Sequence, residues 1–408
     1  MKTGAFIRDN APWLTAGALL TFLSSFGQTY FISIFAGEIQ SAFLLSHGAW
    51  GSMYALGTMA SAAVMVWAGG LTDRFRVRTL GAAVLVFLAI ACLVMALNPF
   101  VWAIPFVIFA LRLAGQGMCS HIAVVAMARW FVATRGRALS VATLGFAAGE
   151  AMLPLSFVAL LAVFDWRILW LVAALTALLA VPLLARLLRQ ERTPQSMSEE
   201  NQSTGMYSRH WTRAEALRHP LFWFMVPALL GPAAFSTAFF FQQVHFAQVK
   251  DVAHITLVAM FPIYTGMGIG AMLLSGWALD RFGTPRLIPY FQLPMVFAFC
   301  IFATAQTVGT ILCGLVFLGL TAGANSTLPN AFWAEFYGTR SIGSIKAMSA
   351  AVMVLGSAIG PGATGVLIDL GVGIEKQYLG VAVYFLFATM LMWVGVSRAR
   401  SSLTSAPA

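Results

Sequence analysis

Two charged side chains lie inside long apolar runs, Arg112 in residues 101–130 and Glu150 in residues 137–163. A charge in such a setting costs a few kcal/mol or more unless it is paired or hydrated. If the runs are antiparallel helices rising 1.5 Å per residue, Arg112 lies about 16 Å and Glu150 about 20 Å from the same end. We therefore expect the two side chains to pair. Either the pair only holds two helices together, or Glu150 takes up a proton and frees Arg112 for an anion.

Two further polar residues follow Arg112 in the same run. Gln116 is four residues on, so an α-helix would place both side chains on one face. His121 is nine residues on, about half a turn out of phase. It is therefore either a packed, hydrogen-bonded histidine or a proton-binding group. Together these residue types could bind an anion and carry a proton.

Neutral polar side chains mark other apolar runs. In residues 13–36 they recur at spacings of three and four, which places them near one helix face: Thr21, Ser24, Ser25 and Gln28. Such a face either lines a cavity or forms hydrogen bonds between helices. Gln243, in residues 221–246, is the expected counterpart of Gln28. Tyr264 and Asn325 are the polar candidates of residues 255–279 and 309–333.

The composition indicates which medium surrounds these runs. The chain has 408 residues, of which 60% are hydrophobic and 9% are charged, whereas soluble domains carry about 25% charged residues. Most of the surface must therefore face lipid. Runs of about 20 apolar residues predict membrane helices. We expect twelve of them: 13–36, 45–69, 79–97, 101–130, 137–163, 166–187, 221–246, 255–279, 287–306, 309–333, 343–368 and 378–396.

The basic residues predict the orientation in the membrane. With the N-terminus inside the cell, twenty of the 24 Lys and Arg residues fall on the cytoplasmic side and three fall outside. This bias predicts that both termini are cytoplasmic. We expect the membrane to be the inner, or plasma, membrane. It also explains the net charge of +10 without a nucleic-acid partner.

Enzyme chemistry and bound cofactors have little support in the sequence. Four cysteines fall within predicted helices and lack the spacing of metal ligands: Cys92, Cys119, Cys300 and Cys313. Phosphate-binding loops, zinc-protease motifs and nucleophile elbows are missing as well. We expect no enzyme activity, no cofactor and no metal site.

A charged motif occurs twice at about half the chain length. Gly69 begins GGLTDRF and Gly276 begins GWALDRF, 207 positions later, and both fit G-x-x-x-D-R-F. The repeat predicts two similar halves, an arrangement found in many transporters. We expect a first six-helix bundle, a cytoplasmic linker, a second six-helix bundle and a cytoplasmic tail, at residues 1–187, 188–220, 221–397 and 398–408.

Twelve spans, a long central loop, the repeated motif and R-x-x-G-Q-G from Arg112 together resemble the major facilitator superfamily. The resemblance implies two pseudo-symmetric bundles around a cavity lined by helices 1, 4, 7 and 10, with alternating access by rocking of the halves. It also implies that charges of the two motif loops hold one state closed. These gating candidates are Asp73, Arg74, Arg78, Asp280 and Arg281.

Trp130 to Gly145 and Trp333 to Gly343 are similar to monocarboxylate porters. Two features of that family are missing. The chain reads Asp9-Asn10-Ala11-Pro12-Trp13 where the family's opening motif would lie, and the eighth helix has no basic residue before the Asp280 loop. Binding of an anion would therefore depend on Arg112 or on a cluster of hydrogen-bonding groups.

We expect a monomeric, proton-coupled transporter of a small organic anion such as a monocarboxylate. The substrate would contact Arg112, Gln116, Gln28, Gln243, Asn325 and Tyr264, and the proton would bind Glu150 or His121. One alternative is proton-coupled efflux of an apolar or cationic compound, which the phenylalanines at 239–241 and the solitary Glu150 also fit. The other is a membrane sensor that does not transport.

Overall fold

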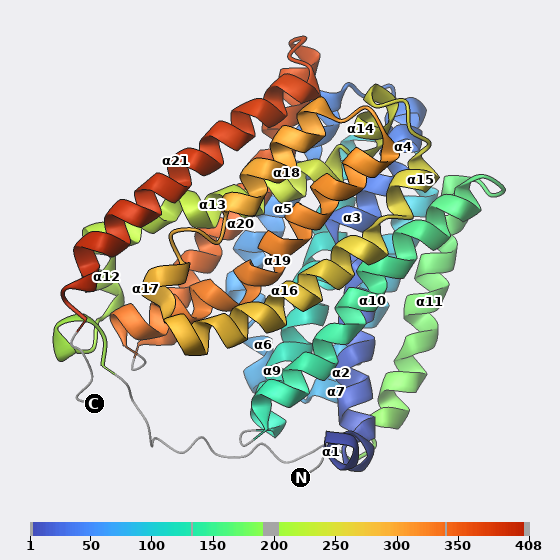
Figure 1. Ribbon diagram of the computed structural model, residues 1–408. Helices are drawn as coiled ribbons and strands as arrows, with labels where there is room; N and C mark the ends of the chain where they lie inside the picture. The colour runs from blue at the N-terminus through green and yellow to red at the C-terminus, as the bar shows by residue number, and fades with distance from the viewer. Residues whose placement is uncertain (1–2, 132–133, 191–203, 339–340, 404–408) are drawn as a thin grey trace. The chain divides into compact units, whose positions relative to one another are not determined.

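The computed structural model describes residues 3–131, 134–190, 204–338 and 341–403 (Figure 1). Throughout these residues the regular structure is helical, which confirms the all-α prediction. The chain divides into two compact units. The first comprises residues 1–198 and 240–245, and the second comprises residues 199–239 and 246–408.

The first unit begins with a broken helix and continues with longer ones. Its α-helices are α1 Thr3–Asp9, α2 Ala11–Leu23, α3 Thr29–Ile32, α4 Ala36–Phe43, α5 His47–Ala68, α6 Leu71–Arg74, α7 Val77–Leu97, α8 Ile104–Leu111, α9 Ser120–Trp130, α10 Arg135–Leu161 and α11 Trp166–Leu187. Short 3₁₀ turns lie at Ser24–Gly27, Ser33–Phe35 and Val101–Ala103, and a π-helical segment covers Arg112–Cys119.

The second unit has a similar set of long helices. They are α12 Arg213–Arg218, α13 Pro220–Phe241, α14 Gln243–Val249, α15 His254–Val258, α16 Phe261–Phe282, α17 Thr284–Leu287, α18 Leu293–Thr304, α19 Val308–Tyr337, α20 Ile342–Asp369 and α21 Ile374–Arg400. The last residues of α13 and the first of α14 belong to the first unit by their contacts.

Ten helical segments of the described chain are long and apolar enough to cross a membrane. An eleventh span is the pair Ala11–Gly27 and Thr29–Phe43, bent by 49°, and Leu293–Thr304 is a shorter apolar helix. Every predicted run therefore corresponds to a helix, and a count of twelve spans is consistent with the structure. Helices suit lipid because they satisfy their own backbone polar groups.

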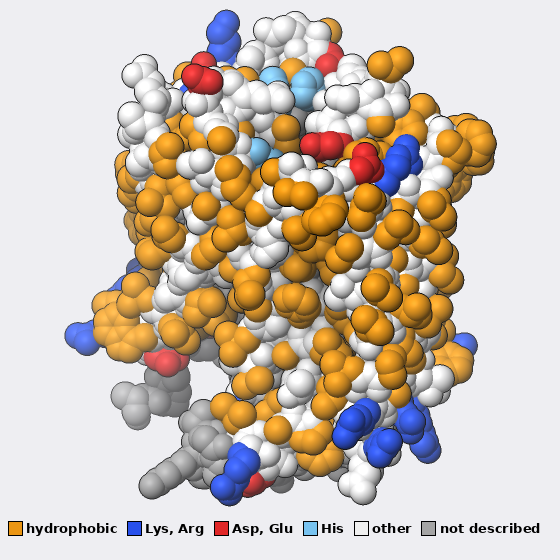
Figure 2. Space-filling view, turned by 90° about the vertical axis from the view of Figure 1, so that its right-hand side faces the viewer, with side chains coloured by type: hydrophobic (Ala, Val, Ile, Leu, Met, Phe, Trp, Pro, Cys, Tyr) orange, Lys and Arg blue, Asp and Glu red, His pale blue; other side chains and the backbone are white. Residues whose placement is uncertain are grey.

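Large apolar side chains on the outside of these helices agree with a lipid environment. Trp67 is 75% exposed and Leu179 is 62% exposed. On the face drawn in Figure 2, hydrophobic side chains cover the middle, and Lys and Arg gather at the lower edge. An apolar surface of this kind is rare on a soluble monomer.

Small residues bring helices together in the first unit, where α10 lies against α2. A Cβ atom at Gly145 would lie 1.9 Å from the Ala18 carbonyl oxygen and 2.4 Å from Thr21 Oγ1. The neighbouring core is aromatic: the ring centroids of Phe31 and Phe157 are 4.9 Å apart, and those of Phe31 and Trp170 are 5.5 Å apart. Thus α2 and α10 pack more closely than any side chain at residue 145 would permit.

We predict that Gly145→Ala lowers the yield of folded, monodisperse protein and its melting temperature. The added methyl group meets backbone rather than a flexible side chain, so the helices must separate, at a cost of about 1–3 kcal/mol or more. Gly270→Ala is the matched control, because a Cβ atom at Gly270 meets nothing within 4 Å. Equal melting of the two variants in detergent would show that the close packing of α2 and α10 does not contribute to stability.

Half of the predicted linker folds onto the second unit. Residues 191–203 lie outside the described residues. Beyond them, Trp211 is buried, and its backbone N–H donates to the Tyr337 carbonyl at 3.2 Å. The short helix α12 follows, with Thr212 and Glu215 capping each other. This part of the linker therefore contains a short capped helix.

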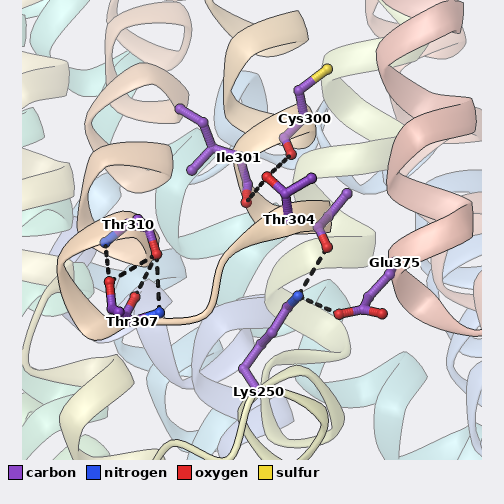
Figure 3. A network of polar contacts seen from close by, with 8 residues as sticks. Lys250, Cys300, Ile301, Thr304, Thr307, Thr310 and Glu375 are labelled. Carbon is purple, nitrogen blue, oxygen red and sulfur yellow. Dashed lines mark hydrogen bonds and ion pairs between the residues drawn. The ribbon is translucent and has the colours of Figure 1, made fainter.

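Lys250 of the second unit has polar partners within that unit. Lys250 Nζ donates to the Ala303 carbonyl at 3.0 Å and forms an ion pair with Glu375 at the start of α21 (Figure 3). The side chain of Lys250 is only 4% exposed. Because its charge is already matched, Lys250 is a poor candidate for binding an anionic ligand.

The two copies of the repeated motif fold differently. In the first copy, α5 ends at Ala68, and Leu71–Arg74 form the separate helix α6. In the second copy, Gly276 to Phe282 continue α16 without a break. That helix ends at Gly283, whose φ of +72° is a left-handed conformation that favours glycine. The two loops are therefore similar in sequence but not in backbone path.

Candidate functional site

The first predicted helix is interrupted at Gln28. After α2 and its 3₁₀ extension, Gln28 adopts an extended backbone with φ −87° and ψ 153°, and α3 begins at Thr29. Such a break leaves carbonyl groups of the preceding turn without their helical partners. Inside a membrane protein these groups must be satisfied by neighbouring residues.

The fourth predicted helix lies directly against this break. A Cβ atom at Gly27 would lie 2.1 Å from the Leu111 carbonyl oxygen, and one at Gly115 would lie 2.6 Å from Gly27 Cα. Both positions therefore require glycine for close approach of the two backbones. This contact holds the side chain of Arg112 beside the break.

Arg112 supplies a hydrogen-bond donor to a backbone carbonyl at the break. Its Nη1 donates to the Gly27 carbonyl at 3.2 Å and to Thr29 Oγ1 at 3.3 Å. The guanidinium carbon lies 5.4 Å from the Tyr54 ring centroid, and the Tyr54 hydroxyl is 2.6 Å from Thr29 Oγ1. The positive charge lies at the C-terminal end of a helical segment, where the helix dipole favours it.

Part of the guanidinium has no protein partner. Arg112 is only 1% exposed, yet its buried Nε makes no hydrogen bond. In the part of the chain that the structure describes, the hydrogen bonds of Arg112 both come from Nη1. Its Nε and Nη2 groups form the side of the fork that binds a carboxylate through two parallel hydrogen bonds. An unmatched buried donor is costly and often marks a site of function.

Arg112 also begins the π-helical segment Arg112–Cys119. Segments of this kind have wider turns than an α-helix and are frequent at functional sites. Gln116 lies within it and is half-buried. The shared face expected for Arg112 and Gln116 was based on α-helical phase, which does not apply across a π-helical segment.

The expected ion pair between Arg112 and Glu150 is not formed. The contacts of Arg112 are those with Gly27, Thr29 and Tyr54. Glu150 is half-buried on α10 and interacts electrostatically with the Tyr30 hydroxyl. Equal depth along two helices does not give the direction of a side chain, and the guanidinium of Arg112 contacts the broken helix instead.

A second set of polar side chains, Tyr30 and Ser25, lies on the broken helix. The Tyr30 hydroxyl, which interacts with Glu150, donates to Ser25 Oγ at 2.8 Å. Ser25 also approaches α10, because a Cβ atom at Gly149 would lie 2.0 Å from Ser25 Oγ. Glu150 is thus connected through Tyr30 to the turn that precedes the break.

The two glutamines expected to orient a substrate have different surroundings. Gln28 lies at the break and is largely buried. Gln243 is fully buried, and its Nε2 donates to Ser33 Oγ at 2.7 Å and to the Tyr30 carbonyl at 3.2 Å. The amide nitrogen of Gln243 is therefore engaged by the first predicted helix in this structure.

The remaining substrate candidates belong to the second unit. Tyr264 on α16 is buried, and Asn325 on α19 is half-buried. The two helices pack closely, since a Cβ atom at Gly319 would lie 2.7 Å from the Tyr264 carbonyl oxygen.

His121 contacts the first copy of the repeated motif, to which the gating candidates Asp73 and Arg74 also belong. His121 Nε2 donates to the Gly69 carbonyl at 3.2 Å, and Arg129 Nη1 donates to the Thr72 carbonyl at 2.8 Å. Both bonds hold the first motif loop. The side chain of Asp73 lies outside the described residues, and the other gating candidates are exposed: Arg74, Arg78, Asp280 and Arg281.

Sequence reasoning missed Thr29 and Tyr54, which complete the surroundings of Arg112. Thr29 directly follows the predicted polar face and was a detectable signal. Nothing in the sequence marked Tyr54 as a site residue, because a tyrosine within an apolar run is more often part of the core.

The comparisons with known proteins decide the family. The family model described as Major Facilitator Superfamily matches residues 17–361, most of the chain. The chain belongs to the major facilitator superfamily. It is therefore a membrane transporter by family, and the prediction that it is not an enzyme agrees with this assignment. A search of curated protein sequences finds no match.

Solved structures share the transporter's fold. A bacterial homolog of the human lysosomal transporter Spinster, in an inward-facing and unoccupied conformation, is similar with a TM-score of 0.75 and 15% identity, over 98% of this chain and 99% of that one. The nucleoside transporter NupG is similar with a TM-score of 0.68 and 15% identity, over the whole of both chains. These likenesses confirm the two-bundle fold class.

Proposed function

We propose that the transporter moves a small organic anion, such as a monocarboxylate, together with a proton. The observation that supports this is the buried guanidinium of Arg112, whose Nε has no partner. A carboxylate that reached this edge would accept two charge-assisted hydrogen bonds.

The surroundings of Arg112 favour a singly charged substrate. Its neighbours are neutral: Thr29, Tyr54 and, at the break, Gln28. One cationic group with neutral donors suits a monocarboxylate better than a phosphate ester, which usually needs more positive charge. Gln116, Gln243, Tyr264 and Asn325 remain the proposed orienting residues.

Glu150 is the proposed proton-binding group. It is half-buried in a membrane helix, where carboxylates are often members of proton relays. Its interaction with Tyr30 connects it to the broken helix that Arg112 contacts. Protonation of Glu150 would therefore change the charge beside the same helix that holds the anion site. His121 is the second proton candidate, with a role at the first motif loop.

The proposed membrane location, oligomeric state and gating residues are those expected for a member of this family. The transporter lies in the inner membrane with both termini in the cytoplasm and works as a monomer. Asp73, Arg74, Arg78, Asp280 and Arg281 bias the exchange between its open states. Their positions in or just after the two copies of the repeated motif support this role.

A thermal-shift screen of the purified transporter tests the substrate class. The panel contains small carboxylates, sugars, nucleosides, amino acids and apolar cations. A ligand at about 100 times its Kd stabilises the folded state by about 2.7 kcal/mol. We expect stabilisation by a carboxylate.

Two results of the screen would contradict the proposal. Stabilisation only by apolar cations, lost in Glu150→Gln, would indicate the efflux alternative. Stabilisation only by nucleosides would assign a neutral substrate instead. A ligand that binds but is not transported in vesicles would favour the sensor alternative.

A further inference from the structure

A groove of about 520 Å³ lies on the first unit where α2 begins and α11 ends. Its apolar wall includes Leu183 and Leu187 of α11. Trp13 also lines the groove, and its Nε1 donates to the Gln190 carbonyl at 2.8 Å. The indole therefore connects the two helices at this end.

Two arginines line the groove. Arg186 is in the last turn of α11, Arg189 lies two residues beyond the end of this helix at Leu187, and both are exposed. Neither side chain forms an ion pair or a hydrogen bond within the described chain, and no acidic residue lines the groove. Among the described residues, the two positive charges therefore have no acidic partner.

The groove lies at a depth where a lipid headgroup would be found. α11 is a candidate membrane span over Trp166–Leu187, so Arg186 lies at its end. Figure 1 draws α1 beside this lower end of α11, and Figure 2 shows Lys and Arg side chains gathered at the same edge. A tryptophan beside arginines at a helix end is typical of the membrane interface.

We propose that this groove binds an anionic phospholipid of the surrounding bilayer. The phosphate would contact Arg186 and Arg189, and an acyl chain would lie along Leu183 and Leu187. Basic pockets between membrane helices on the cytoplasmic side bind anionic headgroups by this combination of charge and apolar contact. The predicted orientation of the transporter places the groove on that side.

Native mass spectrometry of the full-length transporter tests the proposal, with phosphatidylglycerol and phosphatidylcholine of identical chains as probes. We expect preferential retention of phosphatidylglycerol. The Arg186→Gln/Arg189→Gln variant should lose about 30-fold in phosphatidylglycerol affinity, from about fivefold for each arginine. Retention of phosphatidylcholine should not change.

The matched control is Arg398→Gln/Arg400→Gln. It removes the same charge from two exposed arginines in the last turn of α21, and it should retain phosphatidylglycerol like the original protein. Equal losses in the two variants would show only general charge attraction and overturn the proposal. Competition by inorganic phosphate at millimolar concentration would overturn the assignment to a lipid.

A steric variant keeps the test decisive if the double variant does not fold. Leu183→Trp fills the groove without changing the charge, since Leu183 is 47% exposed. It should reduce the retention of phosphatidylglycerol. Unchanged retention in this variant would show that the lipid does not occupy the groove.

Discussion

Replacing Arg112 with glutamine is expected to abolish carboxylate-dependent stabilisation and transport. The substitution removes the positive charge at the break and the fork that would hold the carboxylate. Loss of one partner from a buried, hydrogen-bonded charge pair costs about 2–5 kcal/mol. This corresponds to a loss of about 30-fold or more in affinity, measured by thermal shift and by binding of labelled substrate.

Two control variants separate substrate binding from helix capping. Arg112→Lys keeps the charge but not the planar fork, so we expect intermediate affinity. Arg167→Gln removes an arginine that also donates to carbonyl groups, those of Ala96 and Asn98 at 2.9 Å each. It should lower stability without changing the response to carboxylates. If Arg112→Gln melts earlier but keeps that response in full, Arg112 is only a cap for Gly27.

Glu150→Gln is expected to abolish proton-driven accumulation while leaving substrate exchange intact. Glutamine has a similar shape and can still form hydrogen bonds, but it cannot exchange a proton near neutral pH. We expect uptake driven by a pH gradient to fall to the level of vesicles without protein, with counterflow of labelled substrate retained. Both quantities are measured in the same proteoliposomes.

The control for this variant is Glu38→Gln. Glu38 is another half-buried acid of the first unit, on α4. Its replacement should leave the response to the pH gradient unchanged. If Glu150→Gln keeps the normal pH dependence of uptake, Glu150 does not carry the coupled proton.

The helices of the fold could be predicted because membrane spans depend on local composition. Residues 166–187 were predicted with the bounds that α11 has, and other runs differed by a few residues. The break at Gln28 could not be predicted in this way. It depends on the close contact of Gly27 with Gly115, which lie far apart in sequence.

The sequence identified Arg112 as a candidate but did not predict its surroundings. Arg112 was identified because a charge in an apolar run is costly, and that argument needs no structure. Its pairing with Glu150 was inferred from depth along two helices. Arg112 instead contacts Gly27, Thr29 and Tyr54, because depth along a helix does not give the direction of a side chain.

The most direct test of the account is uptake of a labelled carboxylate into proteoliposomes under an inwardly directed proton gradient. The carboxylate is the one that stabilises the transporter in the thermal-shift screen. We predict that it accumulates above its external concentration, that a protonophore abolishes accumulation, and that Arg112→Gln shows none. Accumulation that is unaffected by the protonophore, or equal in Arg112→Gln, would contradict proton-coupled anion transport at Arg112.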